Sequence, residues 1–197
     1  YGGTLAPNVY YRIYAKYTDY DSSVLGNGSN ATDSWRMDRG GFRIDADNLP
    51  QGTLTLQGDL YHGNENLLTG GIAVVSGANV LGRWSRTFSP DANMSLQLYY
   101  DRDHLASPKP AAGLDPAGTL TDDLDTYDLD FQHHFKTGKN HSFVWGLGYR
   151  FTHDVVGNAP SVGFLPERLD QNLYSAFGQD EIALRSDLHL TLGTKLE

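Results

Sequence analysis

Histidines are the first residues of this sequence that could bind a metal, and there are seven of them in 197 residues. His133 and His134 are adjacent, so on a strand they point to opposite faces and cannot chelate one ion as neighbours. His62, His104 and His153 fall near the predicted outer ends of strands. We interpret these three as ordinary polar rim residues and predict no metal site.

A run of carboxylates is the second candidate for ion chemistry. Calcium prefers oxygen ligands, but the spacing of this run is not that of an EF-hand loop. Asp128 and Asp130 fit better as carboxylates on the wall of a water-filled lumen, paired with arginines on neighbouring strands. The run consists of Asp122, Asp123, Asp125, Asp128 and Asp130.

Catalysis and cofactor binding find no support in the sequence. The chain has no cysteine, and it contains neither a Gly-x-Ser-x-Gly nor a His-Glu-x-x-His motif. Gly40-Gly41 and Gly70-Gly71 are not followed by a predicted helix, so neither opens a phosphate-binding loop. The net charge is -9 with only 15 basic residues, which argues against nucleic acid. We predict no enzyme, no cofactor and no nucleic-acid partner.

The elements that must position these side chains are strands. No run of about 18 apolar residues exists, which excludes a membrane-spanning helix, and alternation with a period of two recurs along the chain. A strand crosses a bilayer with about 10 residues, of which every second one faces lipid. The alternation predicts nine strands, at 8–20, 34–47, 52–62, 79–88, 93–104, 123–136, 141–153, 171–184 and 188–197.

The connections between the predicted strands alternate strictly between short and long. Antiparallel strands put every second connection on the same side, and transmembrane barrels have short periplasmic turns and long outer loops. The pattern therefore predicts an up-and-down transmembrane β-barrel wall. The short turns are 48–51, 89–92, 137–140 and 185–187, and the long loops are 21–33, 63–78, 105–122 and 154–170.

The two faces of the predicted strands differ in composition. One carries leucines and aromatic residues, as contact with lipid requires, and the other carries Asp, Arg, Gln and small residues, as a wet lumen requires. In strand 171–184 neither set of alternate residues is cleanly apolar. The predicted lipid-facing residues are Leu54, Leu56, Leu96, Leu98, Leu129, Phe131, Trp145, Leu147, Leu190 and Leu192. The predicted luminal wall consists of Gln57, Asp59, Arg83, Gln97, Tyr99, Asp101, Asp128, Asp130 and Arg150.

Strand length gives an independent argument for a membrane barrel. A strand of 13 residues is roughly 43 Å long and, tilted near 40°, rises about 33 Å, which exceeds the apolar band of about 25 Å. Nine strands, however, are an odd number, and bacterial barrels have even counts. No signal peptide is visible. We therefore expect the chain to be a piece of a longer protein.

Several segments resemble the barrel of a TonB-dependent outer-membrane receptor, of which Phe177–Ile182 followed by a short turn and Leu190–Glu197 is the most family-like. The others are Leu54–Tyr61, Leu81–Arg86, Leu96–Arg102, Asp125–His133 and Val144–Arg150. Together they cover nearly the whole chain in order.

The resemblance implies a 22-stranded barrel in the cell outer membrane with an N-terminal plug domain. Residues 1–197 are part of the barrel domain alone, without plug or TonB-contacting segment. Such receptors import a scarce small molecule or metal chelate, such as a ferric siderophore or cobalamin, and TonB drives them through the part N-terminal to the barrel. Outer-membrane lipid and lipopolysaccharide are the expected surroundings. The resemblance favours loops 63–78 and 105–122 for ligand binding. A passive pore or structural barrel, and a soluble β-sandwich or adhesin domain, remain alternatives.

Overall fold

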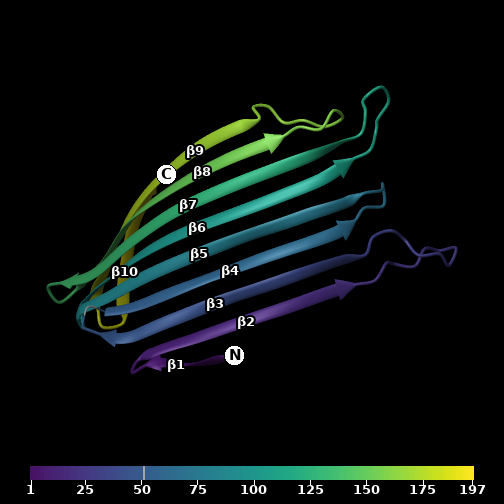
Figure 1. The fold of residues 1–197 in the computed structure, drawn as a ribbon. Coiled ribbons are helices and arrows are strands. Elements are labelled where there is room, and N and C mark those ends of the chain that lie inside the picture. Colours follow the sequence, from purple (N-terminus) through teal and green to yellow (C-terminus); the bar gives the residue numbers. More distant parts are fainter. Residues whose placement is uncertain (51) are drawn as a thin grey trace.

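The chain forms one antiparallel sheet of ten strands in a computed structural model, which describes residues 1–50 and 52–197. Each strand pairs with the next one along the chain (Figure 1). No described residue belongs to a helix that could cross a membrane. The strands are β1 (Gly2–Ala6), β2 (Val9–Tyr20), β3 (Trp35–Leu49), β4 (Gly52–Asn66), β5 (Ile72–Ser89), β6 (Ala92–Lys109), β7 (Gly118–Thr137), β8 (His141–Gly157), β9 (Arg168–Arg185) and β10 (Leu188–Leu196).

The sheet has one more strand than the nine that the sequence predicts. β1 pairs with β2 through Gly2 opposite Arg12 and Thr4 opposite Tyr10, and the turn between them places Asn8 at φ 62°. Asparagine tolerates this left-handed conformation better than most residues. The prediction missed β1 because five residues that include two glycines carry no clear alternation.

The strict alternation of short and long connections is present, but three of the four long loops are shorter than predicted. The segments between strands are 21–34, 67–71, 110–117 and 158–167, so most of the predicted loops 63–78 and 105–122 is strand. Glu65 pairs with Ala73, and Lys109 pairs with Gly118. Backbone pairing needs no apolar side chains, so the strands continue through Gly- and Asn-rich sequence where alternation fades. The turn between β3 and β4 includes Gln51, which lies outside the described residues.

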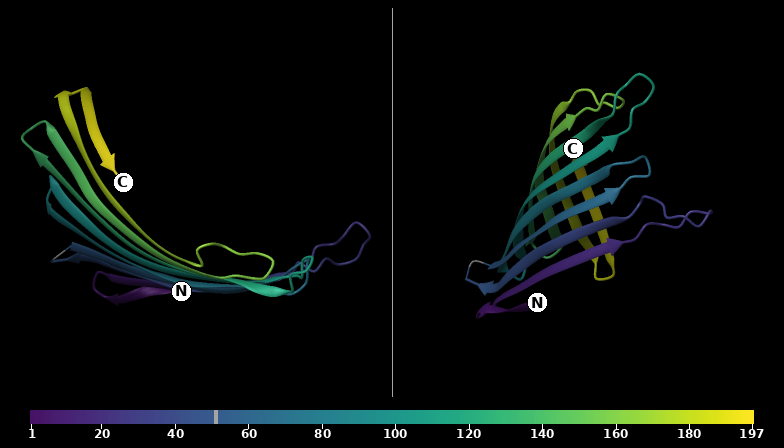
Figure 2. Two further views of the ribbon diagram at one scale, coloured as in Figure 1. Left: turned by 90° about the horizontal axis from the view of Figure 1, so that it is seen from above. Right: turned by 45° about the vertical axis from the view of Figure 1, so that its right-hand side comes forward.

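The sheet is strongly curved, with β8, β9 and β10 turning round toward one side (Figure 2). It is a single layer without a packed interior. Among the described residues no side chain is less than 2% exposed, and the most buried apolar residues are small or isolated: Ala31, Ala46, Ala73, Leu120 and Ala159. A β-sandwich buries the inner faces of two stacked sheets. The structure therefore corrects the sandwich alternative.

Glycines opposite aromatic residues recur across the sheet. In each case the aromatic ring lies over the glycine of the neighbouring strand, where a Cβ would collide with it. Such pairs bury ring surface and cover a gap that the missing side chain would leave. The pairs are Tyr11 and Gly3, Tyr14 and Gly41, Phe42 and Gly58, Tyr61 and Gly77, and Phe177 and Gly146.

Candidate luminal wall and outer loops

All nine predicted wall residues lie on one face of the sheet, in three consecutive rows of directly opposed residues. The first row contains Arg83, Gln97 and Asp130, the second Gln57, Tyr99, Asp128 and Arg150, and the third Asp59 and Asp101. We call this face the wall face. The pairing register brings together side chains that are up to 93 residues apart in sequence, between Gln57 and Arg150.

Charged groups on the wall face pair with polar neighbours, either on the adjacent strand or two residues along the same strand. The Arg150 Nε donates to Asp128 Oδ2 at 2.8 Å, and the Arg83 Nε donates to Gln97 Oε1 at 2.9 Å. Asp130 accepts a hydrogen bond from Gln132 at 3.1 Å. The predicted pairing of acidic residues with arginines on neighbouring strands thus occurs at Asp128 and is wrong at Asp130, because Gln97 and Gly148 stand opposite it.

Tyrosine–carboxylate pairs form a second network on the wall face. The Tyr14 hydroxyl donates to Asp59 at 2.6 Å, the Tyr99 hydroxyl donates to Asp101 at 2.9 Å, and Tyr61 donates to Asp103. Two of these bonds skip a strand, because a tyrosine reaches across the glycine of the strand between: Tyr14 passes Gly41 and Tyr61 passes Gly77. Tyrosines on the polar parity of a strand were the sequence signal for this network.

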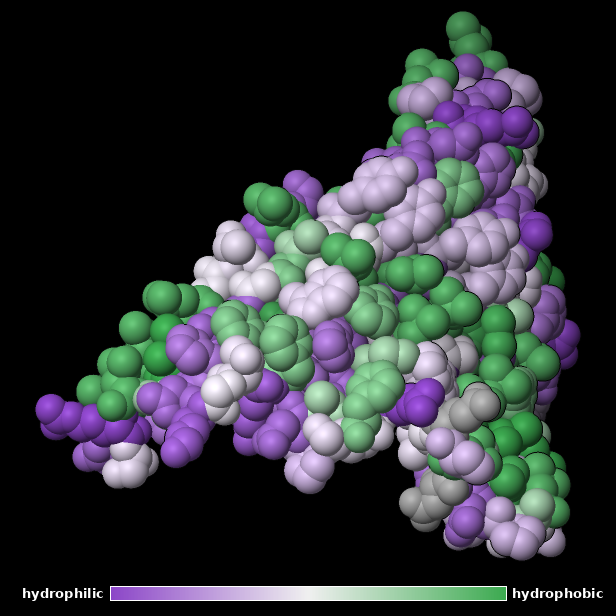
Figure 3. All heavy atoms as spheres, turned by 90° about the vertical axis from the view of Figure 1, so that its left-hand side faces the viewer, coloured by the Kyte–Doolittle hydropathy of each residue, from purple (hydrophilic) through white to green (hydrophobic). Residues whose placement is uncertain are grey.

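The opposite face carries all ten predicted lipid-facing residues, and we call it the apolar face. Leu54, Leu96, Phe131 and Leu147 form one of its rows, and Leu56, Leu98 and Leu129 form the next. Leucines here are unusually exposed: Leu54 by 45%, Leu98 by 54% and Leu147 by 49%. Hydrophobic and pale aromatic side chains gather across the middle of the surface seen from the short-turn side (Figure 3).

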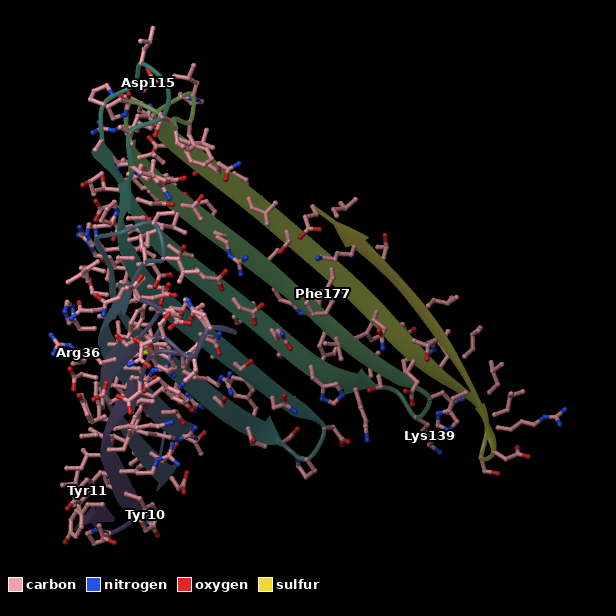
Figure 4. All side chains as sticks on the ribbon, turned by 90° about the vertical axis from the view of Figure 1, so that its right-hand side faces the viewer. Tyr10, Tyr11, Arg36, Asp115, Lys139 and Phe177 are labelled. Atoms are coloured by element: carbon pink, nitrogen blue, oxygen red, sulfur yellow. The ribbon has the colours of Figure 1, made fainter. Side chains whose placement is uncertain are left out.

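The apolar face is the convex side of the curved sheet. On β4, Leu54, Leu56 and Leu60 are exposed, whereas Gln57 and Asp59 on the other parity are only half-exposed. Side chains converge on the concave side of a bent sheet and spread apart on the convex side. Arg36, which shares the parity of the apolar face, projects away from the side toward which β8 to β10 turn (Figure 4).

The band of apolar residues runs obliquely across the rows. On β2 to β4, the end of the band nearest the short turns lies in the row of Val9, Ala46 and Leu54. On β7 and β8 it lies two rows closer to the short turns, at Phe135 and Phe143. It continues one further row, to Ile182 and Leu190, on β9 and β10. The rows run perpendicular to the strands, and the strands of a transmembrane barrel are tilted by 35–45°. The membrane therefore crosses the rows obliquely, as this band does.

Beyond the apolar band, toward the long loops, histidine side chains pair with aspartates. His104 Nδ1 lies 2.9 Å from Asp123, His153 Nδ1 lies 2.5 Å from Asp170, and Arg102 lies 3.4 Å from Asp123. These pairs were not predicted. No group of three or more His, Asp and Glu side chains that could hold a metal ion occurs in the described part of the chain.

His133 and His134 point to opposite faces, as their adjacency predicts. His133 accepts a hydrogen bond from the Trp145 indole at 3.2 Å on the apolar face. His134 lies 2.9 Å from the Ser142 hydroxyl on the wall face. The His133 ring also contacts the rings of Phe88, Phe135 and Trp145, so it belongs to an aromatic cluster.

The long loops gather at one end of the sheet and the short turns at the other. Asp115, in the loop between β6 and β7, and Lys139, in the turn between β7 and β8, mark the two ends (Figure 4). The loop at 158–167 is organised by Asn158, which donates to the Phe164 carbonyl at 3.1 Å and to Glu167 at 2.9 Å. The loop end therefore offers partly structured surfaces rather than extended flexible segments.

Loop 21–34 is held by Asp33, whose Oδ1 accepts a hydrogen bond from the Ser23 amide at 2.8 Å. Hydrogen bonds from the Ser23 hydroxyl and amide lower the pKa of Asp33 from its usual 3.8. A carboxyl with a lowered pKa stabilises the loop above that usual value and loses this effect as the pH falls through the lowered pKa.

We expect the loop to lose order below about pH 4, since the protonated carboxyl is the weaker acceptor. Asp33→Ala should produce the same loss at neutral pH. Hydrogen–deuterium exchange of segment 21–34, corrected for the intrinsic pH dependence, measures both effects. Asp21→Ala is the matched control in the same loop, because Asp21 makes no hydrogen bond with a described side chain. Equal protection in Asp33→Ala and the native protein would contradict the assignment.

The fold and the two faces define a membrane-barrel wall, and the family model named "TonB dependent receptor-like, beta-barrel" matches residues 2–197. The chain belongs to this family. No curated protein matches the sequence.

Solved structures with the same fold include a transporter and two receptors. The copper transporter OprC gives a TM-score of 0.72 at 13% identity, covering 95% of this chain and 32% of that one. The siderophore receptor PirA from Acinetobacter baumannii gives 0.69 at 13% identity, covering 98% and 34%. A mutant of the ferric enterobactin receptor PfeA from Pseudomonas aeruginosa gives 0.68 at 15% identity, covering 98% and 35%. The chain thus spans about a third of the length of these proteins.

Proposed function

We propose that these ten strands are part of the wall of a larger outer-membrane barrel that takes up a scarce ligand by energy coupling. The observation that carries the proposal is the curved single sheet with two chemically different faces. Its polar concave side suits a water-filled lumen, and the oblique apolar band on its convex side suits hydrocarbon. Membership of the TonB-dependent receptor-like family supports energy coupling.

Further strands must complete such a barrel, because unpaired backbone groups in lipid cost several kcal/mol each. β1 and β10 are the two edges of the sheet, and they are not paired with each other in the described chain. We propose that strands outside residues 1–197 close it to the family's 22, around an N-terminal plug through which TonB acts.

The ligand we propose is a small molecule or metal chelate, such as a ferric siderophore or cobalamin. Three of the proteins of similar fold are named for copper, a siderophore and ferric enterobactin. The loop end of the sheet is the proposed site of first contact. Of the loops favoured by the sequence, 67–71 and 110–117 are the parts that are not strand, and 110–117 is the larger target.

Uptake by the full-length receptor tests the proposal. Cells that lack their own receptors would express it and be given ferric enterobactin, cobalamin or Cu²⁺ in turn, with and without a protonophore. We expect accumulation of one ligand that the protonophore abolishes. Accumulation that is insensitive to the protonophore would instead identify a passive pore, and detergent-free solubility would refute the barrel.

Replacement of loop 110–117 by Gly and Ser residues of equal number should lower ligand affinity by tenfold or more, which corresponds to loss of about 1.4 kcal/mol of binding free energy. The matched control is the same replacement at 138–140, in the short turn at the opposite end of the sheet. Ligand binding to whole cells, at equal surface expression, measures the effect. Equal loss in both variants would contradict a role of the loop in binding.

A further inference from the structure

A pocket lies on the wall face at its long-loop end, across strands β3 to β6. Its floor is one row of directly opposed residues, Met37, Gly63, Val75 and Leu105. The volume is about 340 Å³, within the range of roughly 300–1,000 Å³ that small-molecule sites occupy. The floor carries no polar side chain, so it suits an apolar group of a ligand.

The pocket depends on the glycine in the middle of this floor. A Cβ on Gly63 would stand 3.1 Å from the terminal methyl group of Met37 and 3.2 Å from a methyl group of Val75. The side chains of both neighbouring strands therefore lean toward the glycine, and a larger residue there would fill the space between them.

Trp35 forms one side of the pocket and offers it a flat aromatic surface. One face of the Trp35 ring is covered by Tyr20 of β2, with the ring centroids 4.5 Å apart and the planes inclined by 14°. Tyr20 stands on the β2 side of β3, so the other face of the ring is turned toward β4 and the pocket. Another aromatic ring is a group that stacks well on such a face.

Two exposed charged side chains stand at opposite ends of the pocket, and neither has an oppositely charged partner among the described residues. Arg39 lies one row from the floor on the short-turn side, and its Nε donates to Met37 Sδ at 2.8 Å, which draws the guanidinium toward the floor. Glu65 lies one row from the floor on the loop side. Arginine donates to anionic oxygens and glutamate accepts hydrogen bonds.

We propose that this pocket binds a flat aromatic group with an anionic oxygen at one end and a hydrogen-bond donor at the other, as in a hydroxylated benzoate. The ring stacks on Trp35 above Gly63, the anionic oxygen accepts from Arg39, and the donor meets Glu65. The reverse orientation would bring two anions together. The inference rests on the proposed function, because it assigns part of the imported ligand to the concave side that lines the lumen (Figure 2).

Equilibrium dialysis of the full-length receptor in detergent micelles tests the pocket, with para-hydroxybenzoate as the probe and empty micelles as the blank. Benzoate lacks the donor, phenol lacks the anionic oxygens, and cyclohexanecarboxylate lacks the flat ring. Phenol should bind about tenfold more weakly than para-hydroxybenzoate, as the loss of a hydrogen bond to a charged group implies. Benzoate and cyclohexanecarboxylate should also bind more weakly.

Arg39→Gln should lower the affinity for para-hydroxybenzoate about tenfold and leave that for phenol nearly unchanged. Trp35→Leu should weaken binding of the aromatic probes and not that of cyclohexanecarboxylate. Arg36→Gln is the matched control, because it makes the same charge change on the same strand, with a side chain that projects from the opposite face (Figure 4). Heat-modifiable gel mobility verifies that each variant is assembled.

The absence of binding above the micelle blank would overturn the inference. Equal affinities for para-hydroxybenzoate and cyclohexanecarboxylate, or equal losses in Arg39→Gln and Arg36→Gln, would also overturn it. The proposed function fails separately: Arg39-dependent binding by a receptor that accumulates no ligand would refute uptake and leave the pocket. Energy-coupled uptake by a receptor that binds no probe would refute the pocket and leave uptake.

Discussion

Leu98→Arg is expected to block assembly of the barrel, whereas Gln97→Arg at the adjacent position is expected to be tolerated. Leu98 lies in the middle of the apolar face and is 54% exposed there. An arginine on the lipid face near the membrane midplane costs about 2–4 kcal/mol. Gln97 lies on the wall face between Arg83 and Asp130. A new guanidinium there meets water and the Asp130 carboxylate, and its repulsion from Arg83, which now donates to Gln97, costs at most about 1 kcal/mol.

The measurement is heat-modifiable gel mobility of the full-length protein recovered from the membrane fraction. The folded, fast-migrating form should vanish or fall sharply in Leu98→Arg and persist in Gln97→Arg. Because the two positions are neighbours in one strand, differences in expression or strand propensity are small. Equal behaviour of the two variants would reject the assignment of faces, and with it both proposals above.

Gly146→Val is expected to destabilise the barrel by about 1–3 kcal/mol, the usual cost of overpacking. Gly146 lies opposite Phe177, whose ring covers it on the wall face. A Cβ at this position collides with that ring and with the backbone oxygen of Phe131. The ring can rotate away, but the neighbouring strand cannot move without disturbing its own pairing.

Urea unfolding in detergent or lipid measures the free-energy change, with Gly82→Val as the matched control. Gly82 is also in an interior strand, but a Cβ there meets no atom within 4 Å. The free energy of unfolding of Gly82→Val should therefore stay within about 0.5 kcal/mol of that of the native protein, as for ordinary surface substitutions. Equal destabilisation of both variants would assign the cost to the loss of glycine as such and not to the contact with Phe177.

The extent of the loops shows where sequence patterns stop being informative. Residues 63–66, Gly-Asn-Glu-Asn, have the composition of a loop, yet they pair with 72–75 as strands, from Gly63 opposite Val75 to Asn66 opposite Ile72. A hydrogen-bonded ladder needs only backbone groups. Beyond the apolar band both faces meet water, so alternation disappears while the strand continues. β1 was missed for a related reason, since a short strand rich in glycine has no face to reveal it.

The contacts of the wall were only partly predictable. The parity of each strand fixes the face of a side chain, so the positions of Asp128, Arg150 and Asp59 on one face follow from alternation alone. Partners depend on register. That Asp128 meets Arg150, and that Tyr14 reaches Asp59 two strands away, required the actual pairing.

The sequence by itself determined the strand pattern, the ordering of short and long connections, and the two faces, because all three depend on residues that are close together along the chain. Only the tertiary structure decided the register between strands, the curvature that makes the polar face concave, and the place of single residues such as Asp180 beside Phe143 and Leu192. Those features arise from cross-strand packing between distant residues, including rings that settle over glycines, and no local pattern encodes them.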